Sequence, residues 1–333
     1  MKAFFISRYQ KKEPLQFGDM PEPKLGENDV LVGIHATSIN QLDAKIRDGE
    51  FKLILPYKLP LILGNDVAGV VIRVGARVTM FKVGDEVYAR PDKDRIGTFT
   101  EFIALHEADM ALKPKNSSME EAASIPLVAL TAWQALVEWG NLKKGQKVFI
   151  QAGSGGVGTI AIQLAKHLGA TVATTTSASN VELVKRLGAD VVIDYKTQDF
   201  ETILSGYDLV LNSQDAKTLE KSLRILKPGG TLISISGPPD PAFAEEMDLS
   251  WPLKIVLTLL SYSTRKKASR LGVNYSFLFM KASGNQLARI TALIESNIIK
   301  PVVDKIYPFE STNEAIAYVE SGRSKGKVVV KIN

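Results

Sequence analysis

A glycine-rich loop, Gly153-Ser154-Gly155-Gly156-Val157-Gly158, constrains the fold of this 333-residue chain more than any other feature. It follows the apolar run 147–151 and opens a segment with helical periodicity, 157–168. In the pattern G-x-G-x-x-G, the first glycine permits a tight turn, the second lets a diphosphate approach the backbone, and the third lets the helix pack on the strand. We therefore predict a dinucleotide-binding loop with phosphates at the helix N-terminus. The alternative is a ligand-free glycine turn, which this strand-loop-helix context disfavours.

The segments beyond the loop alternate between short apolar runs and helical patterns. Strands are expected at 171–175, 191–194, 209–212, 231–236 and 273–280, and helices at 180–187, 216–226, near 250 and at 283–296. A turn is expected at Lys227-Pro228-Gly229-Gly230, because glycine and proline favour reversals. This alternation predicts an α/β fold with a doubly wound parallel sheet and helices on both faces.

The first 122 residues have a different pattern. Short β-rich runs at 30–36, 67–74, 86–90 and 98–104 are separated by Gly, Pro and Asp, which predicts a partly closed β-domain. A helix is expected over Ala122 to Trp139, and a last strand over Lys327 to Ile332. The chain is thus expected to combine a β-rich domain with a nucleotide-binding one.

Composition excludes several kinds of chemistry. The chain has no cysteine, so it can form no disulfide, thiolate zinc site, iron-sulfur cluster or cysteine nucleophile. Its three histidines, His35, His106 and His167, are widely separated, and we predict no metal site. A net charge of +5 is too small to indicate nucleic-acid binding, so the expected partners are small molecules.

The sequence suggests neither secretion nor a membrane span. The N-terminal segment lacks a signal-peptide hydrophobic region, and the longest apolar run, near 253–260, is interrupted by Lys254. We therefore expect a cytoplasmic protein. The basic cluster 265–270 is interpreted as a solvated helix face, with docking to a membrane surface or an acidic partner as the alternative.

The residues after the second expected strand bear on cofactor choice. NAD-binding loops of this type carry Asp or Glu about 20 residues beyond the first glycine, to accept a hydrogen bond from the ribose 2′-hydroxyl. Residues 171–181 contain no acid, and Thr176, Ser177 and Asn180 offer hydroxyl and amide groups instead. We predict NADP(H) as the cofactor. The alternative is an ordinary exposed Ser/Thr loop.

Several motifs together resemble one family. They are Gly64-Asn65-Asp66-Val67-Ala68-Gly69, Val83-Gly84-Asp85-Glu86-Val87, Leu130-Thr131-Ala132-Trp133, the glycine loop, Leu187-Gly188-Ala189-Asp190 and Gly326-Lys327-Val328-Val329. With this domain order the chain resembles the zinc-independent medium-chain dehydrogenases/reductases, in the quinone oxidoreductase and zeta-crystallin branch. The segment 275–284 is also similar to the reticulon-interacting oxidoreductases.

The resemblance implies an organisation that periodicity does not reveal. It implies a discontinuous GroES-like catalytic domain, 1–122 with 283–333, a Rossmann domain at 123–282, and an active cleft between them. It also implies a homodimer formed through an edge strand near 273–280. Zinc-dependent relatives carry Cys and His-Glu where this chain has Ser38 to Asp43 and Asn65-Asp66, so no zinc is expected.

The resemblance also assigns candidate site residues. Asn40 matches an active-site asparagine, with a turn-forming role as the alternative. Tyr57 is a candidate proton donor, with a cleft-wall or surface aromatic as the alternative. The cofactor-binding candidates are Thr131, Gly153, Ser154, Gly155, Gly156, Val157, Thr176, Ser177, Asn180, Tyr195, Gly237, Phe277 and Phe279. Thr131 can equally be an ordinary helix residue, and the two phenylalanines can equally be buried sheet residues.

These features lead to a hypothesis about function. Because the sequence predicts neither a metal site nor a nucleophile, the cofactor must supply the chemistry of the reaction. We expect hydride transfer from NADPH to a quinone or an α,β-unsaturated carbonyl. The alternative is an NADPH-binding, crystallin-like or partner-binding protein with little catalytic activity.

Overall fold

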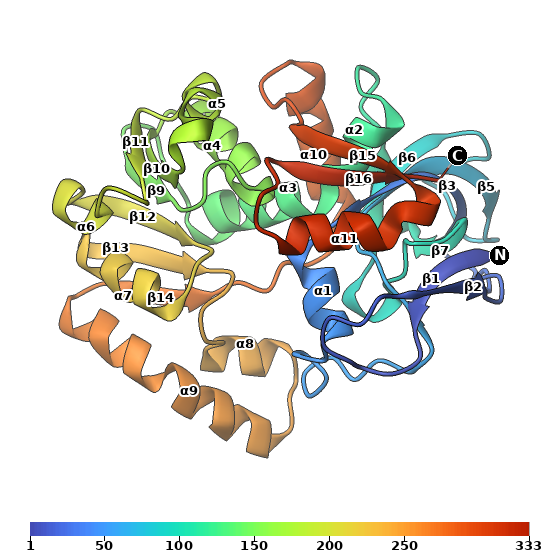
Figure 1. Ribbon diagram of the computed structural model, residues 1–333, viewed down its shortest axis with the longest axis horizontal. Helices are drawn as coiled ribbons and strands as arrows, with labels where there is room; N and C mark the ends of the chain where they lie inside the picture. The colour runs from blue at the N-terminus through green and yellow to red at the C-terminus, as the bar shows by residue number, and fades with distance from the viewer. Residues whose placement is uncertain (333) are drawn as a thin grey trace. The chain divides into compact units, whose positions relative to one another are not determined.

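The computed structural model describes residues 1–332 and divides into two compact units. One consists of Met1–Leu130 with the chain from Lys281 onward, and the other is Thr131–Met280. The expected functional domains, 1–122 with 283–333 and 123–282, have limits close to these. Each unit is described below by itself, and Figure 1 shows the elements with their labels.

The second unit is built on a parallel sheet. Its strands are β9 (Lys147–Ile150), β10 (Thr171–Thr176), β11 (Val191–Asp194), β12 (Tyr207–Asn212), β13 (Leu226–Ser234) and β14 (Asn274–Phe277). Within the described residues the order is β11-β10-β9-β12-β13-β14, with every neighbouring pair parallel. The strand order reverses beside β9, the strand that precedes the glycine loop. Ligands of such sheets bind beyond the carboxyl ends of the strands at this reversal.

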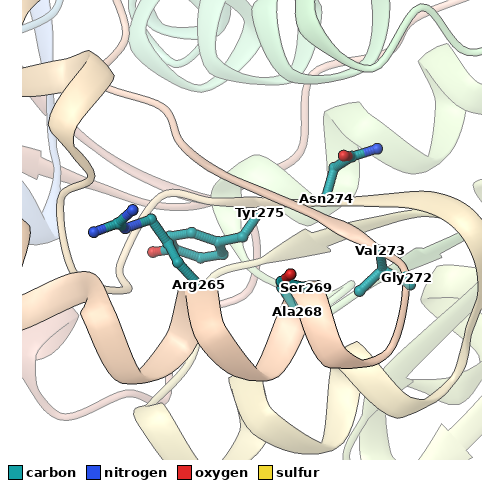
Figure 2. A pocket seen from close by; sticks show the side chains of 7 residues that line it. All are labelled: Arg265, Ala268, Ser269, Gly272, Val273, Asn274 and Tyr275. Atoms are coloured by element: carbon teal, nitrogen blue, oxygen red, sulfur yellow. The ribbon is translucent and has the colours of Figure 1, made fainter.

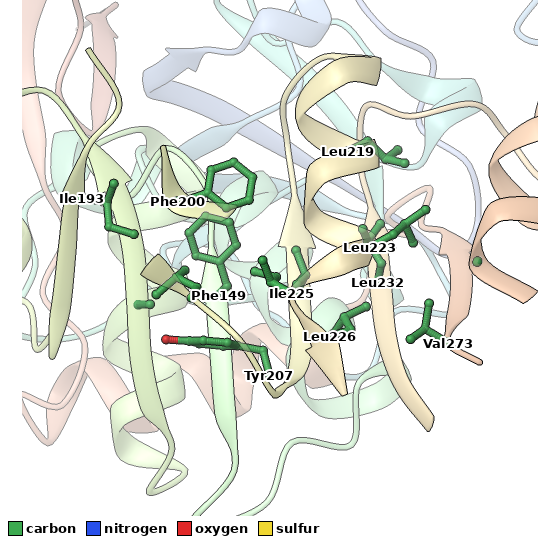
Figure 3. Close-up of a cluster of buried hydrophobic side chains, with 14 residues drawn as sticks. Phe149, Ile193, Phe200, Tyr207, Leu219, Leu223, Ile225, Leu226, Leu232 and Val273 are labelled. Carbon is green, nitrogen blue, oxygen red and sulfur yellow. The ribbon is translucent and has the colours of Figure 1, made fainter. Parts of the chain in front are cut away.

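Helices cover both faces of this sheet, as the sequence pattern predicts. They are α4 (Gly156–His167), α5 (Val181–Arg186), α6 (Phe200–Ile203), α7 (Ala216–Arg224), α8 (Pro241–Glu246) and α9 (Trp251–Arg270). In Figure 1, α4 and α5 lie above the strands, and α7 and α9 lie below them. Figure 3 shows a buried apolar cluster of this unit, in which Phe149 lies beside Phe200 and Leu223 lies beside Leu232. Each such side chain contributes roughly 1.5–3 kcal/mol through burial.

The first unit is mainly antiparallel. Its strands are β1 (Lys2–Ile6), β2 (Gln16–Asp19), β3 (Asp29–Ile39), β4 (Leu61–Ile62), β5 (Val67–Val74), β6 (Glu86–Ala89), β7 (Phe102–His106), β8 (Met110–Leu112), β15 (Val303–Pro308) and β16 (Lys327–Lys331). A large sheet has the order β15-β16-β3-β5-β6-β8, with β7 also paired to β3, and a small one has the order β2-β1-β4. The mixed fold with a β-rich domain is thereby confirmed.

The pairing of β16 with β3 places the last strand of the chain beside a strand from its N-terminal part. These strands run antiparallel, with Val328 opposite Ile39. Lys327 is therefore brought to the end of β3, where α1 (Gln41–Arg47) begins. The remaining helices of the unit are α2 (Met119–Ala123), α10 (Gly284–Glu295) and α11 (Thr312–Glu320), and α3 (Pro126–Trp133) extends into the second unit.

The structure corrects three local expectations. The helix expected over 122–139 is interrupted between α2 and α3 and ends in a π-helix, Gln134–Trp139. The break precedes Pro126, which lacks an N–H and occupies the first position of α3. The turn expected at 227–230 is instead part of β13, where the register with β12 shifts. The strand expected at 273–280 is shorter, Asn274–Phe277, because the chain leaves the sheet after Phe277.

Within residues 1–332, no helix is long and apolar enough to cross a membrane.

Candidate functional site

The glycine loop connects β9 to the start of α4. Ala152 adopts a left-handed conformation (φ 50°), and Gly155 is the N-cap of α4. A Cβ on Gly153 would lie 2.1 Å from Thr174 Oγ1, and one on Gly158 would lie 2.4 Å from the Ala152 carbonyl oxygen. The first and third glycines are therefore required by packing, as the motif predicts.

Gly155 differs from these two glycines. A Cβ at this position would have one neighbour within 4 Å, the Ala152 carbonyl oxygen at 3.3 Å. Packing thus leaves space at the second glycine of the motif, where a diphosphate needs close approach to the backbone. The first N–H groups of α4, from Gly156 and Val157, have no partner within the helix. This combination fits a bound dinucleotide.

A cluster of hydroxyl and amide groups lies beside the loop. The Thr176 hydroxyl donates to Ser154 Oγ (2.9 Å), and Asn180 Nδ2 is 3.3 Å from both Ser154 Oγ and Ser177 Oγ. Tyr195 joins the cluster through its backbone N–H, which donates to the Thr176 carbonyl oxygen (3.2 Å). The structure therefore gathers five of the predicted cofactor-binding residues.

Asn180 has one polar end without a partner. Its Oδ1 is buried and makes no hydrogen bond within the described residues. Amide oxygen and nitrogen can exchange places by rotation, and either orientation leaves one of them unpaired. Buried polar atoms are nearly always paired in folded proteins, so this atom fits a ligand partner.

Gly237 and the two phenylalanines lie near the carboxyl ends of β13 and β14. The Gly237 N–H donates to Ser234 Oγ (2.6 Å), and a Cβ on Gly237 would meet the same oxygen at 2.6 Å. Phe277 is buried against Phe243, with ring centroids 5.1 Å apart, and Phe279 is half-buried beside the same ring. Phe277 therefore fits the alternative interpretation as a core residue, and Phe279 keeps an accessible edge. Thr131 is buried in α3.

A polar network at the ends of β9, β12 and β13 was not expected from the sequence. Asn212 Nδ2 donates to Gln151 Oε1 (2.8 Å), and Ser234 Oγ donates to Asn212 Oδ1 (2.7 Å). Gln151 Nε2 donates to Ser222 Oγ (2.7 Å). Polar residues ending consecutive apolar runs are the signal that could have revealed this network. It fixes the strand ends where a ligand of such a sheet binds.

The first unit contains a second polar cluster, centred on Lys327. Its ammonium group is buried (Lys327 is 5% exposed) and donates to the Ile39 carbonyl oxygen (3.0 Å), to Asn40 Oδ1 (2.5 Å) and to Asp66 Oδ2 (3.2 Å). Asp66 Oδ2 also accepts hydrogen bonds from Asn40 Nδ2 (2.8 Å) and from Ser38 Oγ (2.7 Å). The buried charge pair is thus fully hydrogen-bonded, the condition under which a protein interior tolerates it.

Asn40 is held at both ends of its amide. It precedes α1 as the N-cap and is 6% exposed. Its Oδ1 accepts from Lys327, and one of its two Nδ2 protons goes to Asp66. The second Nδ2 proton is not used by these bonds.

Asp43 extends the cluster. It is fully buried and accepts hydrogen bonds from the Asn40 N–H and from Asn65 Nδ2, both at 2.7 Å. Burial raises the pKa of Asp43 to about 7, although these two hydrogen bonds and the Lys327 charge act in the opposite direction. Sequence reasoning assigned no role to Lys327 or Asp43, because the contact of Lys327 with Asn40 joins residues 287 positions apart.

Tyr57 has a different environment from the one its predicted role requires. Its hydroxyl donates to the Lys93 carbonyl oxygen (2.8 Å), and burial raises its pKa well above the usual range. A phenol with a raised pKa and an engaged proton is a poor general acid. The geometry therefore fits the alternative interpretation, in which Tyr57 is a cleft-wall or surface aromatic residue without a role in proton transfer.

The positions that carry zinc ligands in zinc-dependent relatives are close together in this structure. They lie in the segments Ser38 to Asp43 and Asn65-Asp66. Asp66 Oδ2 accepts hydrogen bonds from Ser38 and Asn40, and the Lys327 ammonium contacts Asn40 and Asp66. A positive charge 3.2 Å from Asp66 Oδ2 opposes a divalent cation at the same place. Across residues 1–332, no three His, Asp or Glu side chains gather in a way that could hold a metal ion. This donor set does not fit a catalytic zinc.

Comparison with known families agrees with the fold. The family model described as alcohol dehydrogenase GroES-like domain matches residues 26–115. The model described as zinc-binding dehydrogenase matches residues 187–330. The second description names a metal for which the Lys327 cluster is unsuited.

Individual relatives match the whole length of the chain. The mitochondrial NAD(P)H oxidoreductase RTN4IP1 of Mus musculus is 36% identical, over 100% of this chain and 89% of its own. The chloroplastic NADPH-dependent alkenal/one oxidoreductase of Arabidopsis thaliana is 34% identical, over 99% and 79%. The solved quinone oxidoreductase of Coxiella burnetii is 29% identical, with a TM-score of 0.87 over 100% of this chain and 99% of that one. This chain belongs to the medium-chain dehydrogenase/reductase family, in its quinone oxidoreductase branch.

Proposed function

We propose that this chain is an NADPH-dependent oxidoreductase that reduces quinones or α,β-unsaturated carbonyls without a metal ion. Its relatives include proteins named NAD(P)H oxidoreductase, alkenal/one oxidoreductase and quinone oxidoreductase, which supports the general activity. The observation that carries the choice of acceptor is the bond between the Lys327 ammonium and the Asn40 amide.

The second unit provides the cofactor-binding residues. The open position at Gly155 and the N-terminus of α4 receive the diphosphate. The cluster of Ser154, Thr176, Ser177 and Asn180 receives the adenosine ribose with its 2′-phosphate, and it contains no acid to repel that phosphate. When bound, the reduced nicotinamide supplies a hydride.

The first unit provides the group that stabilises charge on the acceptor. Reduction of a quinone or an enone places negative charge on an oxygen, which needs a donor at about 2.7–3.1 Å. The free Nδ2 proton of Asn40 is such a donor. Because Lys327 donates to Oδ1 of the same amide, it draws electron density away from the nitrogen and strengthens that donor.

The cluster does not supply a proton to the product. Lys327 uses its protons on Ile39, Asn40 and Asp66. Tyr57 donates to a backbone carbonyl and is left out of the proposed reaction. Solvent supplies the proton to the reduced acceptor. Simple alcohols are poor substrates in this proposal, because alkoxide formation needs a strong Lewis acid or base.

The test follows NADPH absorbance with 1,4-benzoquinone, 9,10-phenanthrenequinone and an enone. Asn40→Ala should lower kcat/KM by roughly 100-fold, the usual effect of losing one oxyanion donor. The Kd for NADPH should stay within about twofold, because the binding residues of the proposal lie in the other unit. Asn28→Ala serves as the matched control, because Asn28 belongs to the same unit and the proposal gives its side chain no role.

Two outcomes would contradict the proposal. If Asn40→Ala keeps full activity, Asn40 is not the donor. If no acceptor is reduced although NADPH binds, the alternative function applies, a nucleotide-binding protein with little turnover. The cytoplasmic location and the homodimer expected from the sequence belong to the same proposal, and sedimentation would test the second against the 36.4 kDa mass of one chain.

A further inference from the structure

Helix α9 exposes a large apolar surface. Its outward-facing apolar residues are Trp251, Ile255, Val256, Leu259, Leu260 and Tyr262. Trp251 is 74% exposed and Leu259 is 69% exposed, values that are unusual for a cluster of large apolar side chains. The proposed activity gives these residues no role.

The spacing places the apolar residues on one side of the helix. Trp251, Ile255, Leu259 and Tyr262 follow one another at intervals of three or four residues, which aligns them along the axis. The opposite side faces the protein, where Leu257, Ser261 and Ala268 are buried. Figure 2 shows this inner side near the end of the helix, with Ala268 and Arg265 beside the chain that leads into β14. The outward side therefore lacks a partner within the described residues.

Basic residues continue the same line. Lys266 follows Tyr262 by four residues, and Arg270 follows Lys266 by four. Neither forms an ion pair within the described residues, and Lys266 Nζ lies 5.5 Å from the centre of the Tyr262 ring. By contrast, Lys267 pairs with Glu220 of α7. No residue of α9 is acidic.

We propose that the outward face of α9, Trp251 to Arg270, docks this protein on an anionic lipid surface. An interfacial helix buries apolar side chains at the headgroup boundary and pairs its basic residues with anionic lipids. Tryptophan and tyrosine favour this boundary, because their rings are apolar with a polar edge. The outward face of α9 has all three kinds of residue: exposed apolar side chains, the aromatic residues Trp251 and Tyr262, and the basic residues Lys266 and Arg270. In this proposal the helix lies along the lipid surface.

Charge argues against a second copy of the chain as the occupant. Two α9 helices packed antiparallel would place Lys266 and Arg270 of each against Trp251 and Ile255 of the other. Because neither helix has an acidic residue, those cations would form no ion pair with the other helix. Parallel packing would bring the two basic ends together. An anionic lipid surface can contact both parts of the face, the apolar residues through its hydrocarbon boundary and the basic residues through its headgroups.

The experiment measures flotation of the full chain with two kinds of vesicle. One is phosphatidylcholine alone and the other contains phosphatidylcholine with phosphatidylglycerol. The wild type should bind the mixed vesicles and bind the neutral ones at least tenfold more weakly. Ile255→Glu with Leu259→Glu should lower binding to mixed vesicles at least tenfold. Lys266→Glu with Arg270→Glu should remove the preference for phosphatidylglycerol.

Controls separate docking from folding and self-association. Met80→Glu with Val83→Glu alters two residues of similar exposure, 59% and 62%, in the other unit and should leave flotation unchanged. Every variant should keep wild-type Kd for NADPH and wild-type turnover, which also separates this proposal from the proposed function. Failure of the wild type to float with mixed vesicles would overturn the proposal. Normal flotation of the variant Ile255→Glu with Leu259→Glu would also overturn it. A sedimentation mass for this variant that is half the wild-type mass would overturn it too, because the face would then be the contact with a second copy of the chain.

Discussion

At Asp43, burial and hydrogen bonding act on one carboxyl group in opposite directions. Burial has the larger effect, and it raises the pKa of Asp43 to about 7 from 3.8. At pH values between these two pKa values, Asp43 is protonated in the folded chain and ionised in the unfolded chain. The contribution of Asp43 to stability therefore falls as pH rises from about 4 to about 7, the reverse of a carboxylate whose pKa is lowered.

Asp43→Asn tests this residue. The difference in free energy of unfolding, wild type minus variant, should fall by a few kcal/mol between pH 4 and pH 7, because only the wild type titrates at this position. The lost acceptor for Asn40 or Asn65 adds a cost that does not depend on pH. Denaturant unfolding at a series of pH values measures the difference, with the exposed Glu22→Gln as control. A difference that stays constant over this range would show that Asp43 remains ionised.

Among elements, the glycine loop combines a packing role with a binding role. Gly153 is surrounded by side chains, whereas Gly155 has open space and sits at the first turn of α4. The same substitution to alanine should therefore affect stability at one position and binding at the other. The two variants are matched in chemistry and lie two residues apart.

Gly153→Ala should lose about 1–3 kcal/mol of stability, because its Cβ would overlap Thr174 Oγ1. Gly155→Ala should lose less than 1 kcal/mol, since only the Ala152 carbonyl must shift. Its Kd for NADPH should rise at least tenfold, because the Cβ would occupy the space where we propose that the diphosphate binds. Unfolding curves and fluorescence titration measure the two effects. Unchanged NADPH binding by Gly155→Ala would place the diphosphate elsewhere.

For the molecule as a whole, ligand binding should act mainly on one unit. The glycine loop and the cluster of Ser154, Thr176, Ser177 and Asn180 both belong to Thr131–Met280. A ligand that binds only the folded state stabilises it by about 2.7 kcal/mol at 100 times its Kd. The unit that holds the cofactor should gain this stability.

NADPH should therefore slow hydrogen exchange most in Thr131–Met280, and NADH at equal concentration should slow it less. Ser177→Asp should reduce the effect of NADPH, because a carboxylate in the cluster repels the 2′-phosphate. Hydrogen-exchange mass spectrometry with each nucleotide gives the comparison. Equal protection by both nucleotides in the wild type would contradict the predicted preference for NADPH.

Local sequence predicts much of this fold for a physical reason. Strand and helix periodicities express which side chains face the core, and glycines mark the positions where a Cβ would clash. Residues 147–194 are described well in this way, including the loop and the two strands that follow it. Two features were mispredicted. The break before Pro126 is a local signal of proline that the expected helix over 122–139 ignored. At 227–230 the chain stays within β13 as an irregularity, because Leu226 and Thr231 on either side both pair with β12.

The sequence by itself determined the parallel sheet, the dinucleotide loop and the absence of thiol chemistry, because each depends on residue types at short spacing. Tertiary structure alone decided the Lys327 cluster and the exposed face of α9. Pairing of β16 with β3 brings Lys327 against Asn40 from 287 residues away, and no local pattern encodes that contact. The apolar residues of α9 have the same sequence signal as a buried helix, and only the packing of the opposite side shows that they face outward.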